Sequence, residues 1–358
     1  MVIRTFHNRQ NTVSIVRKIQ MRTVSVIVPC RNEVRHIRAF LQSLLAQEPH
    51  PDLDCEFLIA DGMSLDGTRA VLSDWQSRLK ALVILNNEKK TVSAGLNVAI
   101  ARARGEIIIR MDVHAEYAPD YIQQCVTALE KTGADNVGGP ALTRGVTYIE
   151  RAVCAAYHSA FGCGGARFHN PNYEGYVDTV TYGCWRKSTL EKLGLFDEEL
   201  VRNQDDELNL RLLRRGGKIW QTPKIRSWYY PRSSLHALVR QHTQYGYWKV
   251  RVIQKHRVVA SWRHLVPGVF AATLFVLGTS ALFLTPSANA LVAVLTVYGL
   301  ASIVAGLIAC GRKNLSLVPV MPFVFASYHV PYGIGFLGGL CDLLMRRKPA
   351  QTFIALTR

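Results

Sequence analysis

The chain has 358 residues, 49% of them hydrophobic, and a formal net charge of +17 at pH 7. This length suits one large core, or a domain with an appendage. The eight cysteines form no C-x-x-C pair and no zinc-ligand spacing, so we expect reduced thiols in a cytosolic environment and no zinc site.

The first 22 residues combine basic side chains with short apolar pieces. They contain no continuous apolar run, and we therefore expect no signal peptide. The stretch fits a basic lead-in, or an extension upstream of a true start at Met21.

Strand-like and helix-like segments then alternate along the chain. The β-branched run 24–29 predicts a buried strand that Pro29 stops, and residues 34–47 follow with helical spacing. Strand, polar turn and helix recur between residues 56 and 103, and residues 106–110 form a fourth strand. This alternation predicts an α/β fold with a parallel sheet, whose ligand crevice opens at the carboxyl ends of the strands.

The polar turn after the second strand contains Asp61, Ser64 and Asp66. Their oxygens could accept hydrogen bonds from a nucleobase and a ribose, while the glycines beside them permit close backbone approach. An Asx-type turn before a helix capped at Asp66 or Thr68 explains the same residues equally well. The chain has neither G-x-G-x-x-G nor G-x-x-x-x-G-K-S/T, which argues against a dinucleotide enzyme and a P-loop ATPase.

The fourth strand delivers Asp112 and His114 to its tip. Side chains two apart on extended backbone face the same way, so a carboxylate and an imidazole there could share one divalent cation. Alternatively, Asp112 caps the next helix and His114 packs against its neighbours.

Four ordered motifs carry a family resemblance: VSVIVPCRNE, ADGMSLDGT, AGLNVAIARARGEIIIR and MDVHA. On these motifs the chain, from about residue 23 onward, resembles the inverting family 2 glycosyltransferases, which have the Rossmann-like GT-A fold of nucleotide-diphospho-sugar transferases. Within that family it is similar to membrane-bound bacterial exopolysaccharide glucosyltransferases of the succinoglycan type. His114 stands where most of the family has aspartate.

The resemblance implies a nucleotide-diphospho-sugar donor that lies across the strand tips. Asp61 would hold the nucleobase or ribose, with help from Asn32 and Glu33. Asp112 and His114 would hold Mg²⁺ or Mn²⁺ on the diphosphate, and because imidazole suits a softer cation, His114 favours Mn²⁺. The further substrate-binding positions expected are Pro29, Ser64, Asp66, Asn97, Arg110, Trp185, Gln241 and Trp248.

Residues 146–161 predict a helix, and the glycine-rich run 162–170 predicts a loop. Such a loop could act as a lid over the site or as a passive connection, and both interpretations stay open. The resemblance places the acceptor side at residues 182–200.

The acidic run 204–207 is a second chemical centre. Three acids at the start of a helix can simply stabilise its N-terminus. The resemblance instead gives Asp205 the position of the catalytic base, with Asp206 as the fallback and Gln204 in place of the usual glutamate.

No acidic residue occurs between Glu207 and Asp342, and basic residues crowd the first part of that stretch. Residues 235–255 predict a basic interfacial helix with interspersed aromatic side chains. Gln241 and Trp248 match the Gln-x-x-Arg-Trp motif of processive relatives only loosely, which favours addition of a single sugar.

Residues 265–284 and 291–310 are each long and apolar enough to span a bilayer. A basic belt beside such spans is better explained by anionic lipid headgroups than by nucleic acid. Prolines and glycines interrupt residues 315–344, for which we expect a re-entrant or interfacial segment with the C-terminus in the cytosol.

The sequence thus predicts a lead-in (1–22), a GT-A catalytic domain (23–230), a basic interfacial region (231–264), a membrane module (265–345) and a cytosolic tail (346–358). The expected reaction transfers a hexose, glucose from UDP-glucose, to a hydroxyl of a polyprenyl-diphosphate-linked saccharide in exopolysaccharide biosynthesis. The enzyme would sit in the bacterial inner membrane with its catalytic domain facing the cytoplasm, where other exopolysaccharide assembly proteins are candidate partners. Two alternatives stay open: a polyprenyl-phosphate sugar synthase, and a membrane-anchored binding protein without turnover.

Overall fold

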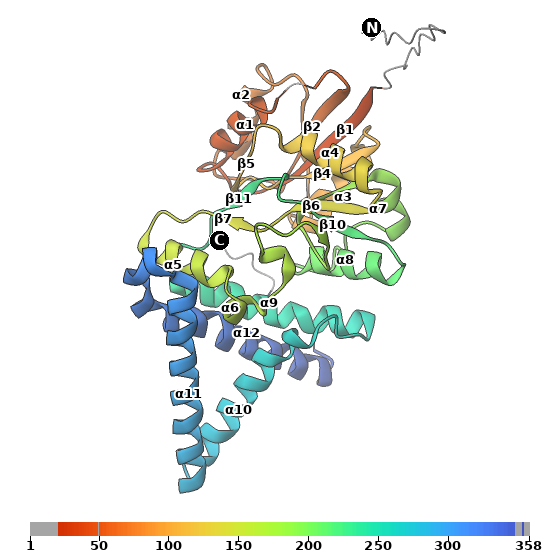
Figure 1. Ribbon diagram of the computed structural model, residues 1–358. Coiled ribbons are helices and arrows are strands. Elements are labelled where there is room, and N and C mark those ends of the chain that lie inside the picture. Colours follow the sequence, from red (N-terminus) through yellow and green to blue (C-terminus); the bar gives the residue numbers. More distant parts are fainter. Residues whose placement is uncertain (1–20, 49, 348–352, 354–358) are drawn as a thin grey trace, which may run out of the picture.

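The computed structural model describes residues 21–48, 50–347 and 353. An α/β domain occupies the upper part of Figure 1, and the C-terminal helices lie beneath it. Most of the expected lead-in and of the expected tail falls outside the described residues.

An eight-stranded sheet forms the centre of the α/β domain, in the order β3-β2-β1-β4-β9-β6-β10-β8. Its strands are β1 (Arg22–Cys30), β2 (Leu53–Asp61), β3 (Leu82–Asn86), β4 (Ile107–Arg110), β6 (Asn136–Gly139), β8 (Gly175–Tyr176), β9 (Thr181–Arg186) and β10 (Ile219–Gln221). The first four strands are parallel, as the alternation of strand and helix predicts. The expectation of a wholly parallel sheet is wrong, because β9 runs antiparallel to both β4 and β6. A long excursion without a simple crossover helix delivers β9 in the opposite direction.

Pro29 does not end the first strand. β1 continues to Cys30, which pairs with Asp61 of β2. On the other side, β4 pairs with β1 only as far as Ile27. The proline therefore lies beyond the last β1–β4 rung, where its missing N–H removes no bond to β4.

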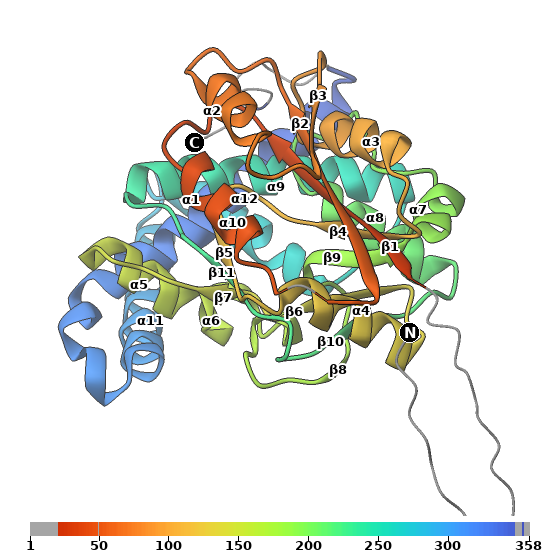
Figure 2. The same ribbon diagram turned by 90° about the horizontal axis from the view of Figure 1, so that it is seen from above.

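Helices cover both faces of this sheet, because successive strand side chains point to opposite sides. Val26 belongs to the core under α1 (Ile37–Leu45), α2 (Thr68–Trp75) and α4 (Tyr121–Thr132). Its neighbour Ile27 belongs to the core under α3 (Val92–Arg102), α7 (Lys187–Leu193) and α8 (Gln204–Arg214). Figure 2 shows α1 and α2 on one side of β1 and β2, with α3 on the other.

A small second sheet crosses the carboxyl end of β4. It has the order β5-β11-β7 and consists of β5 (Ala115–Tyr117), β7 (Leu142–Thr143) and β11 (Ser227–Tyr229). In its register, Tyr229 lies opposite Ala115, directly after the predicted strand tip. The sheet therefore fixes the segment that carries His114.

The C-terminal helical module consists of α9 (Leu235–His256), α10 (Val266–Ser280), α11 (Thr285–Cys310) and α12 (Met321–Leu344). In Figure 1, α9 and α12 run beneath the α/β domain, while α10 and α11 form a V that points away from it. Two segments, Thr285–Cys310 and Arg312–Leu344, are long and apolar enough to cross a membrane. The helix found at the first predicted span, residues 265–284, is shorter than predicted, since α10 ends at Ser280 after 15 residues.

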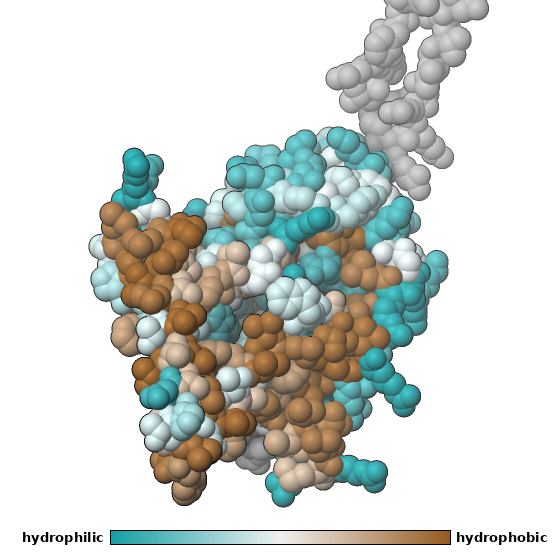
Figure 3. All heavy atoms as spheres, turned by 60° about the horizontal axis from the view of Figure 1, so that its bottom comes forward, coloured by the Kyte–Doolittle hydropathy of each residue, from teal (hydrophilic) through white to brown (hydrophobic). Residues whose placement is uncertain are grey.

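The underside of the molecule is largely hydrophobic (Figure 3). Phe275 of α10, Phe283 in the following turn and Ile308 of α11 are 70%, 84% and 78% exposed. Side chains of this kind are normally buried, and so large an apolar surface marks a contact with another apolar phase.

The expected interruption of residues 315–344 is only partly found. α12 is one continuous helix of 24 residues that contains Pro331, although a short 3-10 segment, Arg312–Val320, precedes it. Its glycines permit close packing: a Cβ atom at Gly335 would lie 1.9 Å from the backbone oxygen of Thr243 in α9. α12 packs against α9 and helps to bury nine of its 22 residues, and the expected interfacial position of α9 at a membrane stays a prediction.

We expect Gly335→Ala to lower the melting temperature, whereas Gly338→Ala on the same helix leaves it unchanged or slightly raised. A methyl group at Gly335 meets backbone, and overpacking of this kind typically costs about 1–3 kcal/mol. A Cβ atom at Gly338 meets nothing within 4 Å. There alanine gains up to about 1 kcal/mol of helix propensity. Thermal unfolding in mild detergent measures the melting temperatures of the two variants. Equal melting temperatures for Gly335→Ala and Gly338→Ala would contradict the close contact at Gly335.

Candidate active site

The carboxyl ends of β1 and β4 open into a cavity of about 2110 Å³. Its walls come from the α/β domain and from all four long helices of the C-terminal helical module. Of the predicted site residues, the wall includes Pro29, Asn32, Glu33, Asp66, Arg110, Asp112, His114, Asp205, Asp206 and Gln241. The cavity therefore joins both predicted chemical centres in one space.

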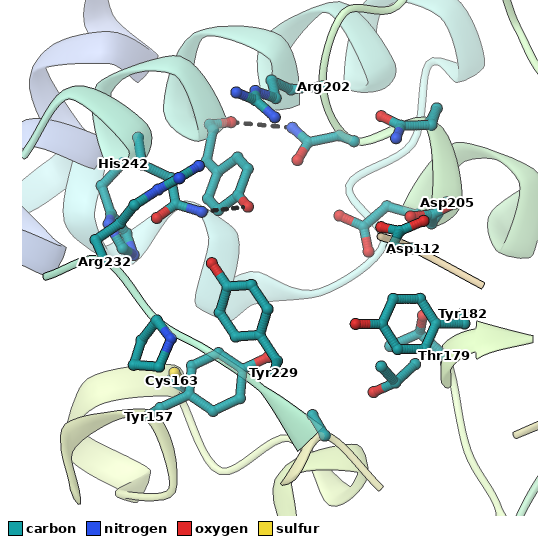
Figure 4. Close-up of a pocket in the computed structure, with 18 of the residues that line it drawn as sticks. Asp112, Tyr157, Cys163, Thr179, Tyr182, Arg202, Asp205, Tyr229, Arg232 and His242 are labelled. Atoms are coloured by element: carbon teal, nitrogen blue, oxygen red, sulfur yellow. Dashed lines mark hydrogen bonds between the residues drawn. The ribbon is translucent and has the colours of Figure 1, made fainter. Parts of the chain in front are cut away.

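Arg110 holds these two centres together. Its guanidinium group, only 4% exposed, makes two contacts with Asp112, Nε to Oδ1 at 3.0 Å and Nη2 to Oδ2 at 3.2 Å. Its Nη1 pairs with Asp205 of α8. Burial alone would lower the pKa of Arg110, but the two carboxylates raise it above the usual value. Figure 4 shows Asp112 and Asp205 side by side at one end of the pocket.

Tyr117 fixes the backbone at the strand tip. Its hydroxyl accepts a hydrogen bond from the amide of Asp112 at 2.6 Å and donates one to the carbonyl of the same residue at 3.2 Å. Tyr117 lies on β5, almost fully buried, so the Asp112 backbone is held from the second sheet. The sequence offered no signal for this role beyond a tyrosine five residues downstream.

The chain does not stay extended after Asp112, contrary to the prediction. It turns, and the amide of Ala115 donates to the carbonyl of Asp112 at 3.3 Å. A strand and not a helix follows, so the alternative of a helix cap at Asp112 is also wrong. The His114 Nδ1 atom lies 3.9 Å from Oε1 of Glu33. Burial lowers the pKa of His114, an effect that Asp112 opposes, and the ring is therefore neutral at pH 7.

A divalent cation fits the chemistry of Asp112 and His114, although no group of three His, Cys, Asp or Glu side chains suited to a metal occurs among the described residues. Mg²⁺ and Mn²⁺ are commonly held by one or two side chains together with phosphate oxygens and water. A neutral imidazole and a carboxylate meet that need. Asp112 would have to exchange at least one Arg110 contact for the cation.

The polar turn after β2 is an Asx-type turn, as one of the two interpretations predicted. The wholly buried carboxylate of Asp61 accepts hydrogen bonds from the Ser64 hydroxyl at 2.5 Å and from Arg69 Nη1 at 3.2 Å. Asp66 accepts from the amides of Val34 and Thr68, both at 3.0 Å. The cap of α2 is Gly67, and neither Asp66 nor Thr68 takes that place. Asp61 and Ser64 lie behind the cavity wall.

The loop after β1 is joined to this turn. The side-chain oxygen of Asn32 accepts a hydrogen bond from the backbone amide of Leu65 at 3.0 Å. The backbone amide of Asn32 donates one to the Ser64 hydroxyl at 2.8 Å. The amide of Glu33 donates to the Thr68 hydroxyl at 2.7 Å. These bonds fix the floor of the cavity between β1 and β2.

Three further predicted substrate-binding residues lie away from the cavity wall. Asn97 binds the backbone of Phe196 through both ends of its amide, at 2.9 Å each. Trp185 is buried in the core against the same phenylalanine. Trp248 packs in a cluster around α9, and its indole donates to the carbonyl of Phe353 at 2.9 Å. Asn97 and Trp248 therefore have structural hydrogen-bond partners, whereas Trp185 is held by packing alone and its indole nitrogen has no hydrogen-bond partner among the described residues.

The three acids that open α8 each have a different cation. Asp205 pairs with Arg110, and Asp206 pairs with Lys249 at 2.6 Å. Glu207 is buried between Arg211 and His256, at 2.8 Å from each. All three lie in the first helical turn, so they also favour the positive end of the helix.

Burial raises the pKa of Asp205 above its usual value, and the Arg110 cation opposes that shift. For Asp206, burial also acts to raise the pKa, but Lys249 holds it below its usual value. Asp205 is therefore the more basic carboxylate of the pair. It is also the one that lies beside Asp112.

The segment between β7 and β8 folds against the C-terminal helical module. It contains α5 (Tyr148–Tyr157) and α6 (Ala160–Cys163), and the carbonyl of Phe161 contacts Nε2 of His329 in α12 at 2.9 Å. Several of its residues line the cavity, including Tyr157 and Cys163 in Figure 4. Whether it works as a lid or as a passive connection stays a prediction.

Sequence reasoning missed the basic residues on the module side of the cavity, among them Arg202, Arg232, Lys249, Arg263 and His264. It assigned the charges of residues 231–264 to a membrane surface. The long stretch without acids after Glu207 was the available signal, because cations without neighbouring acids in the sequence need an anion from elsewhere.

Comparison with known proteins agrees with this geometry. The family model "Glycosyl transferase family 2" matches residues 25–193. The succinoglycan biosynthesis protein ExoA of Rhizobium meliloti is 31% identical over 252 residues, 70% of this chain and 76% of that protein.

A second relative is the dolichyl N-acetyl-alpha-D-glucosaminyl phosphate 3-beta-D-2,3-diacetamido-2,3-dideoxy-beta-D-glucuronosyltransferase of Methanococcus voltae, 29% identical over 243 residues, 66% of this chain and 75% of that protein. Among solved structures, the mannosyltransferase PcManGT of Pyrobaculum calidifontis, in complex with GDP-Man and Mn2+, superposes with a TM-score of 0.57 at 18% identity, over 89% of this chain and 87% of its own. That last likeness concerns the fold alone.

We expect Arg110→Gln to lower the free energy of unfolding by about 3 kcal/mol, the lower part of the range for a buried ion that loses its partner, because Asp205 is partly exposed. Two neighbouring carboxylates then lack a cation, and their repulsion raises the pKa of Asp205 further. A folded-state pKa above the unfolded value lowers stability as pH rises, so the deficit is largest at neutral pH and shrinks on acidification.

Melting temperatures between pH 8 and pH 5 measure this deficit. Arg104→Gln is the matched control, since Arg104 is 59% exposed and its ion pairs lie at the opposite end of the sheet. A deficit for Arg110→Gln that does not change with pH would contradict the proposed repulsion.

Proposed function

The chain belongs to glycosyl transferase family 2 and is a glycosyltransferase with a GT-A domain, and from this premise we propose that it transfers a sugar from a nucleotide diphosphate donor to a lipid-linked saccharide. The observation that carries the proposal is the single cavity, which begins at Asp112 and Asp205 and ends against the apolar C-terminal helical module. A soluble acceptor would not need such a wall.

The donor lies across the carboxyl ends of β1 and β4. Asn32 and Glu33 line the cavity there and hold the nucleobase or ribose, and the wholly buried Asp61 supports them from behind the wall through Ser64, which bonds both Asp61 and Asn32. Asp112 and His114 would hold a divalent cation, Mn²⁺ or Mg²⁺, and this cation would neutralise the charge that accumulates on the leaving diphosphate. Neutral His114 is able to act as a ligand without first losing a proton.

Asp205 acts as the general base on the acceptor side. It removes the proton from the acceptor hydroxyl while that oxygen attacks the anomeric carbon from the face opposite the diphosphate. The bond to the diphosphate breaks, the configuration inverts, and the proton remains on the carboxylate. Arg110 orients Asp205 and balances its charge against that of Asp112 throughout.

In this proposal the C-terminal helical module attaches the enzyme to a membrane. Its apolar underside and the two segments long enough to cross a bilayer support this (Figure 3). The relative from Rhizobium meliloti is a succinoglycan biosynthesis protein, which supports a role in exopolysaccharide assembly. UDP-glucose as the donor and a polyprenyl-diphosphate-linked saccharide as the acceptor complete the proposal. The catalytic domain then faces the cytoplasm, where sugar nucleotides are made.

We expect Asp205→Asn to lower kcat by about 10² to 10⁴ while the KM for the donor barely changes, since a general base acts in the chemical step. Nucleotide diphosphate release with lipid-linked acceptor measures this. In the wild type, the rate falls on acidification at a pH above the usual aspartate range, because burial raises the pKa of Asp205.

Asp206→Asn is the matched neighbour and should keep most of kcat. The reverse pattern, a dead Asp206→Asn and an active Asp205→Asn, would assign the base to Asp206. Release that does not depend on acceptor in any variant would contradict transfer itself.

For the cation, Asp112→Asn should abolish turnover at any practical Mn²⁺ concentration. His114→Asp should keep activity and shift the preference toward Mg²⁺, because a carboxylate suits the harder ion. Calorimetric titration of Mn²⁺ in the presence of UDP gives a second measurement, independent of turnover. Full activity of the wild type in excess chelator would contradict this assignment.

A further inference from the structure

The cavity changes character where it meets the C-terminal helical module. Lys249 of α9 is only 6% exposed, and its Nζ contacts Asp206 at 2.6 Å. Arg263, in the short 3-10 helix Trp262–His264 that precedes α10, contacts Asp178 at 2.5 Å. Both cations therefore line the cavity wall, on two consecutive elements of the chain.

Each of these carboxylates can release its cation at low cost. The side chains of Asp206 and Asp178 are 42% and 47% exposed, so water can solvate them when another anion takes their place. Lys249 is nearly buried and needs an anionic partner at all times. An anionic ligand could therefore replace Asp206 beside Lys249 and Asp178 beside Arg263.

Two further polar atoms, on residues that line this wall, lack partners among the described residues. The Nδ1 atom of His264 and the hydroxyl of Tyr332 in α12 are buried atoms without a hydrogen bond among the described residues. Buried polar atoms are normally paired, and an unpaired one on a cavity wall suggests a ligand. Burial and the nearby Lys249 lower the pKa of His264 to about 4, and Asp206 opposes this shift. A bound anion between these groups would, like Asp206, raise the pKa of His264.

Beyond these polar groups the wall is apolar. Val266 and Phe270 of α10 and Tyr298 of α11 continue it toward the part of the module that carries no charge. Trp262, which is 76% exposed, lies on the rim. A ligand that follows this wall has an anionic group at one end and a long hydrocarbon chain at the other.

We propose that Lys249, Arg263 and His264 form the site that binds the phosphate groups of an isoprenoid-linked acceptor, whose chain leaves along Val266 and Phe270 toward the bilayer. The inference rests on the proposed function and adds the subsite that reads the phosphate. Lys249 pairs with Asp206, the residue after the base, so the phosphate end is held close to Asp205. A short glycan is therefore enough to carry the accepting hydroxyl to the base.

The test compares two acceptors that share one saccharide, the first linked to an isoprenoid diphosphate and the second to a phosphate-free alkyl chain. For Arg263→Gln and for His264→Ala, the KM for the diphosphate acceptor should rise about ten- to hundredfold, the effect of losing a charge-assisted hydrogen bond. The penalty should shrink to twofold or less with the phosphate-free acceptor. The KM for the donor stays within twofold.

Arg257→Gln is the matched control, because Arg257 is an exposed arginine at the end of α9 that does not line the cavity. Equal penalties on both acceptors would overturn the proposal. So would an unchanged KM in both variants while the wild type transfers sugar efficiently. If the wild type transfers to neither acceptor, the proposed function itself fails, which is a distinct result.

A bulk phospholipid headgroup is the other source of phosphate for this site. Assays in phosphatidylcholine and in phosphatidylglycerol nanodiscs separate the two sources. The proposal expects the penalty of Arg263→Gln to be the same in both. A penalty that appears with the phosphate-free acceptor only in phosphatidylglycerol would assign the site to a headgroup and overturn the proposal.

Discussion

One buried cation has to serve two carboxylates, and the rest of the site depends on that constraint. Arg110 ends β4, while Asp205 begins α8, 95 residues later. An uncompensated charge at a buried position is costly, so the guanidinium keeps Asp112 and Asp205 at a fixed separation. The central sheet positions the arginine, and α8 must then be placed where its first turn reaches the strand tip.

The features that the sequence predicts best depend on local order. Strand, turn and helix repeat through the first hundred residues, and Asp112 and Asp205 fall in motifs whose order along the chain is recognisable. The direction of β9 depends on a long excursion, which no local pattern encodes. Asn97 and Trp185 were expected to bind substrate on the family resemblance, but in this chain Asn97 bonds Phe196 and Trp185 packs in the core.

Charge was harder to interpret than hydrophobicity. From the sequence alone, the basic residues of the region 231–264 resemble a belt that faces a membrane. In three dimensions Lys249 and Arg263 line the cavity, and α12 covers part of α9. The glycines of α12 make that cover possible, since Gly335 lets the helix approach the backbone of Thr243. A pattern of glycines and prolines that suggested a broken segment thus specifies a tightly packed helix.

The mixed origin of the cavity wall has a consequence for how the protein is made. The α/β domain is synthesised first, and domains generally fold as they emerge. Its central sheet can therefore form before the last hundred residues have left the ribosome. The cavity, however, is complete only when α12 has contributed Tyr328 and Tyr332 to its wall. A chain that has not yet reached its final helices therefore holds Asp112 and Asp205 without an enclosed space around them.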